Sequence, residues 1–164
     1  MNTGHLIDLL KKENVLKYGD FTLRSGKTSS YYCDIKQGLG NVKILAEIVK
    51  LLTPLVPEKA TCVAGSGYGG VTLATLVAYK KKLPLVLVRD TVKDHGTKKI
   101  IDGYVPTKKD CVCIIDDVFT TGSSIADIQE KLQSLKCKLT KPVVVLKRSK
   151  KSGVVSILTE KDLL

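Results

Sequence analysis

The stretch of residues 111–125 limits what this chain can fold into more than any other part of the sequence. Five apolar residues at 111–115 run directly into Asp116 and Asp117, and a segment of Thr, Gly and Ser follows. An apolar run of this length is typical of a buried parallel strand, and the small polar residues after it predict the start of a helix. Because open α/β sheets bind ligands at the carboxyl ends of their strands, we expect the two carboxylates there, in a ligand site.

The polar segment after the acid pair predicts a phosphate-binding loop. Backbone N–H groups of residues 120–124, with the neighbouring hydroxyls, would lie at the N-terminus of the next helix, which favours anions. Two carboxylates accept hydrogen bonds from a diol, so the whole segment indicates a ligand with both a diol and a phosphate, such as a ribose 5-phosphate. The acids could instead cap the following turn. Two adjacent carboxylates after a buried strand are costly without a polar ligand, so we favour the functional role.

Strands and helices alternate along most of the chain. The predicted helices cover residues 5–18, 44–52, 71–79 and 123–135. The predicted strands cover residues 21–23, 31–33, 61–64, 85–88, 111–115, 142–146 and 154–158, and a glycine-rich turn is expected at 65–70. This order predicts an α/β fold with a central, mostly parallel sheet flanked by helices. Because no repeat or linker interrupts the order, we expect a single domain over residues 1–164.

The connection between the strands at 85–88 and 111–115 is long and basic. Its basic residues are Arg89, Lys93, His95, Lys98, Lys99, Lys108 and Lys109. An Asp-Gly pair between apolar residues predicts a hairpin at 100–105. A basic loop on such a hairpin is suited to act as a lid over an anionic site, and a solvated hairpin without a function is the alternative. A lysine and a titratable histidine in one short stretch favour the lid.

The charge and composition of the chain narrow its possible partners and location. The net charge is +11, from 27 Lys and Arg against 16 Asp and Glu, which suits a polyanionic ligand or a Lys-rich solvated surface. The absence of Trp and of interleaved aromatic and basic residues argues against nucleic-acid binding. No apolar run is long enough to span a membrane, and no signal segment opens the sequence. Five cysteines without a CxxC pair indicate a reducing compartment, so we expect a cytoplasmic protein.

Four segments of the chain combine into a known pattern. Residues 114–125 hold a strand, an acid pair and a Thr-Gly-Ser loop, and residues 21–32 hold a polar turn between two short strands. Arg89 is followed by Lys93-Asp94-His95-Gly96, and Arg148 comes shortly after the last long apolar strand. The first segment resembles the signature of the type I phosphoribosyltransferases. The other three resemble the amino-terminal hood, the catalytic loop and the base-binding arginine of the orotate branch of that family.

The resemblance implies a reaction and an architecture. Members of this branch transfer the 5-phosphoribosyl group of 5-phosphoribosyl 1-diphosphate (PRPP) to orotate, giving orotidine 5′-monophosphate and pyrophosphate, with Mg²⁺ as cofactor. Their type I phosphoribosyltransferase fold has a small amino-terminal hood, here residues 1–40 or so, on a core of about residues 41–164. Their catalytic loop reaches into the neighbouring subunit, so the resemblance also implies a homodimer.

The resemblance also assigns roles to residues. Lys93 and Asp117 are the implied catalytic residues, and no protein residue is assigned to a metal. The implied PRPP-binding residues are Arg24, Arg89, Lys93, His95, Asp116, Asp117, Val118, Phe119, Thr120, Thr121, Gly122, Ser123 and Ser124. The implied orotate-binding residues are Thr120, Arg148 and Tyr32. Loss of pyrophosphate builds a cation on the ribose ring, and the acid pair would stabilise that cation while basic groups neutralise the leaving anion.

Three positions depart from the family pattern. Asp90 stands where many members carry a lysine, Gly69 stands where some bacterial members do, and Arg24 occupies a hood position often filled by lysine. The glycine-rich turn at 65–70 receives pyrophosphate in the family, although its glycine pattern alone is weak. Two other functions stay open at this point. One is a phosphoribosyltransferase for another base, and the other is a PRPP-sensing regulator that binds nucleic acid.

Overall fold

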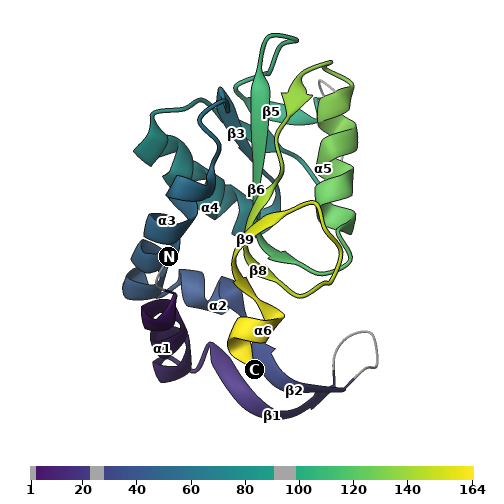
Figure 1. Cartoon of the computed structure of the whole chain (residues 1–164). Helices are drawn as coiled ribbons and strands as arrows, with labels where there is room; N and C mark the ends of the chain where they lie inside the picture. Colours follow the sequence, from purple (N-terminus) through teal and green to yellow (C-terminus); the bar gives the residue numbers. More distant parts are fainter. Residues whose placement is uncertain (1–2, 23–27, 91–98) are drawn as a thin grey trace.

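A seven-stranded, mostly parallel sheet forms the centre of the molecule (Figure 1). The computed structural model describes residues 3–22, 28–90 and 99–164. Its strand order is β5-β4-β3-β6-β8-β9, with β7 also paired to β6, and only β5 runs antiparallel to its neighbour. The strands are β3 (Cys62–Gly65), β4 (Leu85–Val88), β5 (Ile101–Gly103), β6 (Cys111–Phe119), β7 (Lys138–Leu139), β8 (Val143–Lys147) and β9 (Val155–Thr159).

Helices cover both faces of this sheet. On one face α3 (Val42–Leu52) and α4 (Gly67–Lys81) pack on the sheet, and on the other lies α5 (Ser123–Gln133) (Figure 1). Successive residues of β6 alternate between these layers, because Cys113 belongs to the core under α3 and α4 while Val112 belongs to the core under α5. A strand buried on both faces must be apolar throughout, which explains the run at 111–115. The α/β fold predicted from the sequence is confirmed.

A small antiparallel sheet lies beside the amino-terminal helix. It pairs β1 (Leu16–Thr22) with β2 (Thr28–Cys33), and α1 (Gly4–Lys12) precedes it. The short helix α2 (Ile35–Leu39) follows β2, η1 (Thr53–Leu55) follows α3, and α6 (Glu160–Leu163) lies near the carboxyl terminus. Tyr31 of β2 is buried, and its hydroxyl donates to Glu160 of α6 (3.3 Å), so the small sheet is tied to the last helix.

The helix predicted at 5–18 is wrong in its second half. Helix α1 ends at Lys12, and Asn14 adopts a left-handed backbone conformation (φ +56°) before β1 begins at Leu16. Val15 and Leu16 continue the helical apolar spacing, but they enter the same core from a turn and a strand. The short elements α2, β7 and α6 were not predicted, because none is long enough to show a hydrophobic period.

Three further predictions about local structure are corrected. Strand β6 does not end before the acid pair but continues to Phe119, since Asp116 pairs with Val144 of β8 and the ladder continues beyond it. The glycine-rich segment is not a turn throughout, because α4 already begins at Gly67. Asp102 and Gly103 do not form a hairpin turn but belong to β5, where Asp102 lies opposite Leu87.

None of the helices in the described ranges has the length and apolar character that crossing a bilayer requires.

Candidate active site

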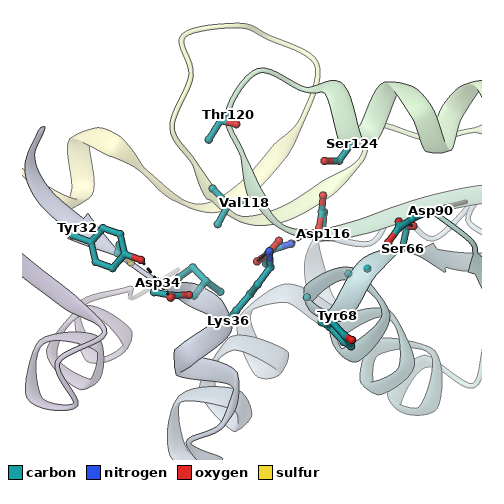
Figure 2. Close-up of a pocket in the computed structure, with 16 residues that line it drawn as sticks. Tyr32, Asp34, Lys36, Ser66, Tyr68, Asp90, Asp116, Val118, Thr120 and Ser124 are labelled. Atoms are coloured by element: carbon teal, nitrogen blue, oxygen red, sulfur yellow. Dashed lines mark hydrogen bonds and ion pairs between the residues drawn. The ribbon is translucent and has the colours of Figure 1, made fainter. Parts of the chain in front are cut away.

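A cavity of about 620 Å³ opens where the small amino-terminal sheet faces the carboxyl-terminal half of β6 (Figure 2). Its wall on one side is residues 32–36, from the end of β2 and the start of α2. The first turn of α4, residues 66–70, and the side chain of Asp90 form the opposite wall. Asp116 and Val118 of β6 lie between them, and Asp117 of the same strand also lines the cavity. Thr120 and Ser124 come from the loop before α5 and its first turn.

The acid pair lies buried at the bottom of this cavity. Asp116 and Asp117 are each 8% exposed, and the backbone N–H of Asp117 donates to Asp116 Oδ1 (2.9 Å). Lys36 of α2 places its Nζ 3.9 Å from Asp117 Oδ2. Burial, reinforced by repulsion from the neighbouring Asp117 carboxylate, raises the pKa of Asp116 to about 7. A group held this way favours a ligand that donates hydrogen bonds or brings positive charge.

Glycines let the start of α4 approach the acid pair. A Cβ atom built on Gly69 would lie 2.6 Å from Asp117 Cγ, and one on Gly70 would lie 3.3 Å from Asp116 Oδ1. At Gly65, the last residue of β3, a Cβ would lie 2.4 Å from the carbonyl oxygen of Gly70. The Gly69 departure therefore has a steric reason in this chain: any side chain there displaces Asp117 from its present position.

The loop between β6 and α5 has the form expected of an anion site. Gly122 is the N-cap of α5 in a left-handed conformation (φ +88°), and it has no side chain to satisfy the first N–H groups of the helix. The ring of Phe119 lies under it, since a Cβ at Gly122 would be 2.8 Å from Phe119 Cε2. Thr121 and Ser123 bring their hydroxyl oxygens within 3.1 Å of each other. Thr121 and Gly122 line a smaller neighbouring cavity, and Phe119 is buried beside it.

The predicted base-binding residues separate into two groups. Tyr32 lines the main cavity with Thr120, its ring packs 5.7 Å from that of Phe21, and its hydroxyl donates to Asp34 Oδ2 (3.4 Å). Arg148 is not among the residues that line this cavity. Its guanidinium carbon instead lies 4.9 Å from the centre of the Tyr31 ring.

Of the basic residues predicted to bind pyrophosphate, the structure describes Arg89. Arg24, Lys93 and His95 lie outside the described residues. Arg89 pairs with Asp102 of β5 and lines a separate cavity beside Tyr68, so the structure does not bring its side chain together with the acid pair. Its Nε is buried and has no hydrogen-bond partner among the described residues.

Several lining residues were not among the site residues assigned from the sequence, and the charged ones are Asp34, Lys36 and Asp90. A signal for the first two was present, because Asp34 accepts a hydrogen bond from the backbone N–H of Gln37 (3.1 Å) and an acid followed three residues later by Gln is a helix-start signature. A helix predicted from this signature would have included Lys36, whose side chain lies near Asp117 of β6 in the structure. Asp90 had been noted only as a departure from the family.

Across the described ranges, no three or more His, Cys, Asp or Glu residues form a group that could hold a metal ion. Among the described residues, the carboxylates that line the cavity belong to Asp34, Asp90, Asp116 and Asp117, and the last two are adjacent on β6. Mg²⁺ prefers such oxygens and is usually held by one or two carboxylates together with water and substrate phosphates. The residues present therefore fit an ion that arrives with a phosphorylated substrate.

The chain is similar in sequence and structure to known proteins, although no family model matches it. The orotate phosphoribosyltransferase of Methanopyrus kandleri is 36% identical over 172 aligned residues, which cover 99% of this chain and 92% of the relative. The crystal structure of orotate phosphoribosyltransferase from Aeropyrum pernix has a TM-score of 0.83 and 32% identity, and covers 97% of this chain and 96% of that one. A crystal structure of the Mycobacterium tuberculosis enzyme in complex with PRPP has a TM-score of 0.75 at 23% identity, over 97% and 96% of the two chains, and so shares the fold.

Proposed function

Because the chain belongs to the orotate phosphoribosyltransferase family, we propose that the cavity of Figure 2 is its active site. The enzyme transfers the 5-phosphoribosyl group of PRPP to orotate and releases pyrophosphate, a step of pyrimidine nucleotide synthesis. The observation that carries the assignment of the site is the buried acid pair with the first turn of α4 against it and the start of α5 beside it.

Asp116 and Asp117 bind the ribose in this proposal. Their carboxylates accept hydrogen bonds from the two ring hydroxyls, and their negative charge stabilises the cation that develops on the ring as the bond to pyrophosphate breaks. Removal from water strengthens this interaction, and both residues are already buried in the ligand-free protein, each with 8% of its surface exposed. Asp117 acts as a catalytic residue because it would touch the reacting sugar.

The 5′-phosphate binds at the start of α5. Thr120, Thr121, Ser123 and Ser124 supply hydroxyls, Gly122 supplies backbone N–H without a competing side chain, and Val118 and Phe119 support the loop from the strand side. The positive end of the helix dipole favours the phosphate there. This contact fixes the position of the sugar and performs no chemistry itself.

The diphosphate then extends toward the first turn of α4. We assign Arg24, Arg89, Lys93 and His95 to it on the resemblance of their segments to the family, with Lys93 as the catalytic cation. Mg²⁺, when bound with PRPP, neutralises part of the diphosphate charge, and Asp116 and Asp117 are the residues that would share it.

Orotate approaches the opposite side of the ribose, near Tyr32 and Thr120. The ring of Tyr32 offers a flat apolar surface for the base. Arg148 would serve the carboxylate or the carbonyl edge of orotate through its bidentate fork, which requires its guanidinium to leave the ring of Tyr31.

We propose a single-domain protomer, with residues up to about 40 as the hood, that works as a homodimer. Two tyrosines of α4, Tyr68 and Tyr79, are 93% and 83% exposed. They are eleven positions apart and so lie on one side of the helix, where a protein partner would cover both. A second copy of this chain is the partner that the family implies.

We also propose a cytoplasmic location. All five cysteines are free thiols, and burial raises the pKa of the Cys33, Cys62 and Cys113 thiols to about 11. Thiols that stay protonated and buried serve as packing groups, which suits a reducing compartment.

The test is orotate consumption followed by ultraviolet absorbance with PRPP and Mg²⁺, run in parallel on the wild type and on Asp117→Asn. We expect turnover in the wild type and a loss of about 10²-fold or more in the variant, with the melting temperature little changed. Consumption of adenine, hypoxanthine or uracil in place of orotate would contradict the choice of base. Salt-dependent binding of a nucleic acid without turnover of any base would instead indicate a regulator.

A further inference from the structure

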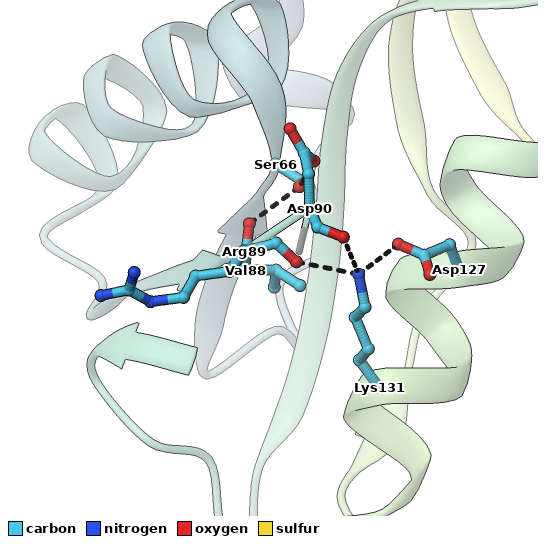
Figure 3. Close-up of polar contacts among 6 residues, drawn as sticks. All are labelled: Ser66, Val88, Arg89, Asp90, Asp127 and Lys131. Carbon is cyan, nitrogen blue, oxygen red and sulfur yellow. Dashed lines mark hydrogen bonds and ion pairs between the residues drawn. The ribbon is translucent and has the colours of Figure 1, made fainter. Parts of the chain in front are cut away.

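A lysine on α5 holds the end of β4 from outside the cavity (Figure 3). The Nζ of Lys131 donates to the backbone carbonyls of Arg89 (2.8 Å) and Asp90 (3.1 Å) and to the carboxylate of Asp127 (2.6 Å). These acceptors use all three N–H groups of the ammonium, and the side chain is only 15% exposed. A lysine so fully bonded keeps the Arg89–Asp90 backbone in one position.

The side chain of Asp90 continues this chain of contacts to the start of α4. Its Oδ1 lies 2.5 Å from the hydroxyl oxygen of Ser66, which also lies 2.8 Å from the carbonyl oxygen of Val88. Both partners are acceptors, so the Ser66 hydroxyl donates toward β4 (Figure 3). The charged acceptor at the shorter distance is the stronger one.

This direction of the Ser66 hydroxyl has a consequence for α4. Ser66 is the N-cap residue of the helix, and serine in that position usually accepts a hydrogen bond from one of the first N–H groups. Here the Ser66 side chain makes no such cap. The first N–H groups of α4, in the segment 66–70 that lines the cavity, therefore have no cap from the Ser66 side chain.

We propose that Lys131 is a positioning residue for the diphosphate end of the active site. By fixing the backbone at Asp90, it keeps the Asp90 carboxylate beside Ser66, and the Ser66 hydroxyl is thereby held away from the amides of α4 that the diphosphate needs. Asp90, which stands where many family members carry a lysine, acquires a role in this chain. The inference rests on the proposed function in one respect, because it assumes that the diphosphate binds at residues 66–70, at the start of α4.

The test measures binding of inorganic pyrophosphate with Mg²⁺ by calorimetry, which does not depend on turnover of any base. Lys131→Met keeps the apolar stem of the side chain and removes its three N–H donors. We expect the dissociation constant of this variant for pyrophosphate to be about tenfold higher than that of the wild type, while the KM for orotate changes less than twofold. Lys131→Arg should recover part of the affinity. Lys50→Met is the matched control, because Lys50 also pairs with a carboxylate on its own helix but lies on α3 outside the cavity.

Repeating the measurement in a Ser66→Ala protein separates an effect through the Ser66 hydroxyl from a general effect of Lys131→Met on folding. If Lys131 acts through the Ser66 hydroxyl, Lys131→Met should change pyrophosphate binding less than twofold when Ser66→Ala is already present. An equal loss in both backgrounds would overturn the proposal, as would wild-type affinity in Lys131→Met alone. A wild type that binds pyrophosphate but does not convert orotate would overturn the proposed function and leave this inference standing on its own measurement.

Discussion

Replacing Gly69 by alanine is the sharpest test of the close contact between α4 and the acid pair. The added Cβ would lie 2.6 Å from Asp117 Cγ and 2.7 and 2.9 Å from its two oxygens. Ordinary contacts between such atoms begin near 3.5 Å, so the carboxylate has to retreat by about 1 Å. A shift of this size at a catalytic group costs about 10²-fold in rate. We therefore expect kcat/KM for PRPP to fall by about that factor in Gly69→Ala.

The stability of the same variant should change little, which separates the two effects. Alanine is favoured over glycine inside a helix by about 1 kcal/mol, and this gain opposes the strain of moving the carboxylate. Thermal unfolding should show a melting temperature within a few degrees of the wild type. Gly40→Ala is the matched control, since φ there is −74° and the nearest atom to the added Cβ would be 3.4 Å away. Full activity in Gly69→Ala would refute the claim that Asp117 must stay where it is.

Three other predictions address the same cavity. The folded state raises the pKa of Asp116 from its ordinary 3.8 to about 7, so the stability that comes from its bound proton is complete below pH 4 and lost by pH 7. Urea unfolding of the ligand-free protein should therefore show a free energy of unfolding that falls as the pH rises from 4 to 7, and Asp116→Asn should show a weaker dependence; identical pH profiles in the two proteins would contradict this role of Asp116. Lys36→Met removes the cation beside Asp117 and should raise the KM for PRPP several-fold, while Lys43→Met, on the neighbouring helix and outside the cavity, should not. Mixing Asp117→Asn with Lys93→Ala chains should restore activity in part of the heterodimers, and no recovery at any mixing ratio would argue against sites shared between subunits.

The longer strands of the sheet and the helices that pack on it were predictable because each has a clear apolar signal, which the short strands β5 and β7 lack. The run at 111–115 corresponds to β6, and the helical spacing at 44–52 corresponds to α3. Most buried apolar residues of these two elements belong to the cores on the two faces of the sheet. The predicted boundaries failed where polar residues lie inside an element. Asp116 and Asp117 were taken to end the strand, yet they form part of its ladder, since a functional carboxylate interrupts the apolar pattern without interrupting the backbone pairing.

The site was predictable where its residues are adjacent in the sequence and not where the fold assembles it. Asp116, Asp117, Thr120 and Ser124 come from one stretch and do line one cavity. Lys36 and Ser66 reach the same cavity from other elements, and no short motif connects them to the acid pair. Arg148 was assigned to the base from its position in the sequence after a strand. In the structure its guanidinium lies over the ring of Tyr31 and does not line the cavity.

In the proposed arrangement, helix α5 would link the sites of the two ends of the substrate. Its first turn carries Ser124, and Lys131, seven residues further on, contacts the end of β4. Seven helical residues span about 10 Å, so the helix sets the distance between the loop before α5 and the backbone of Arg89 and Asp90. A one-residue insertion between Ser124 and Lys131 would rotate Lys131 by about 100° around the helix and remove it from the end of β4. The same insertion after Gln133 would leave Ser124 and Lys131 in their present relative positions.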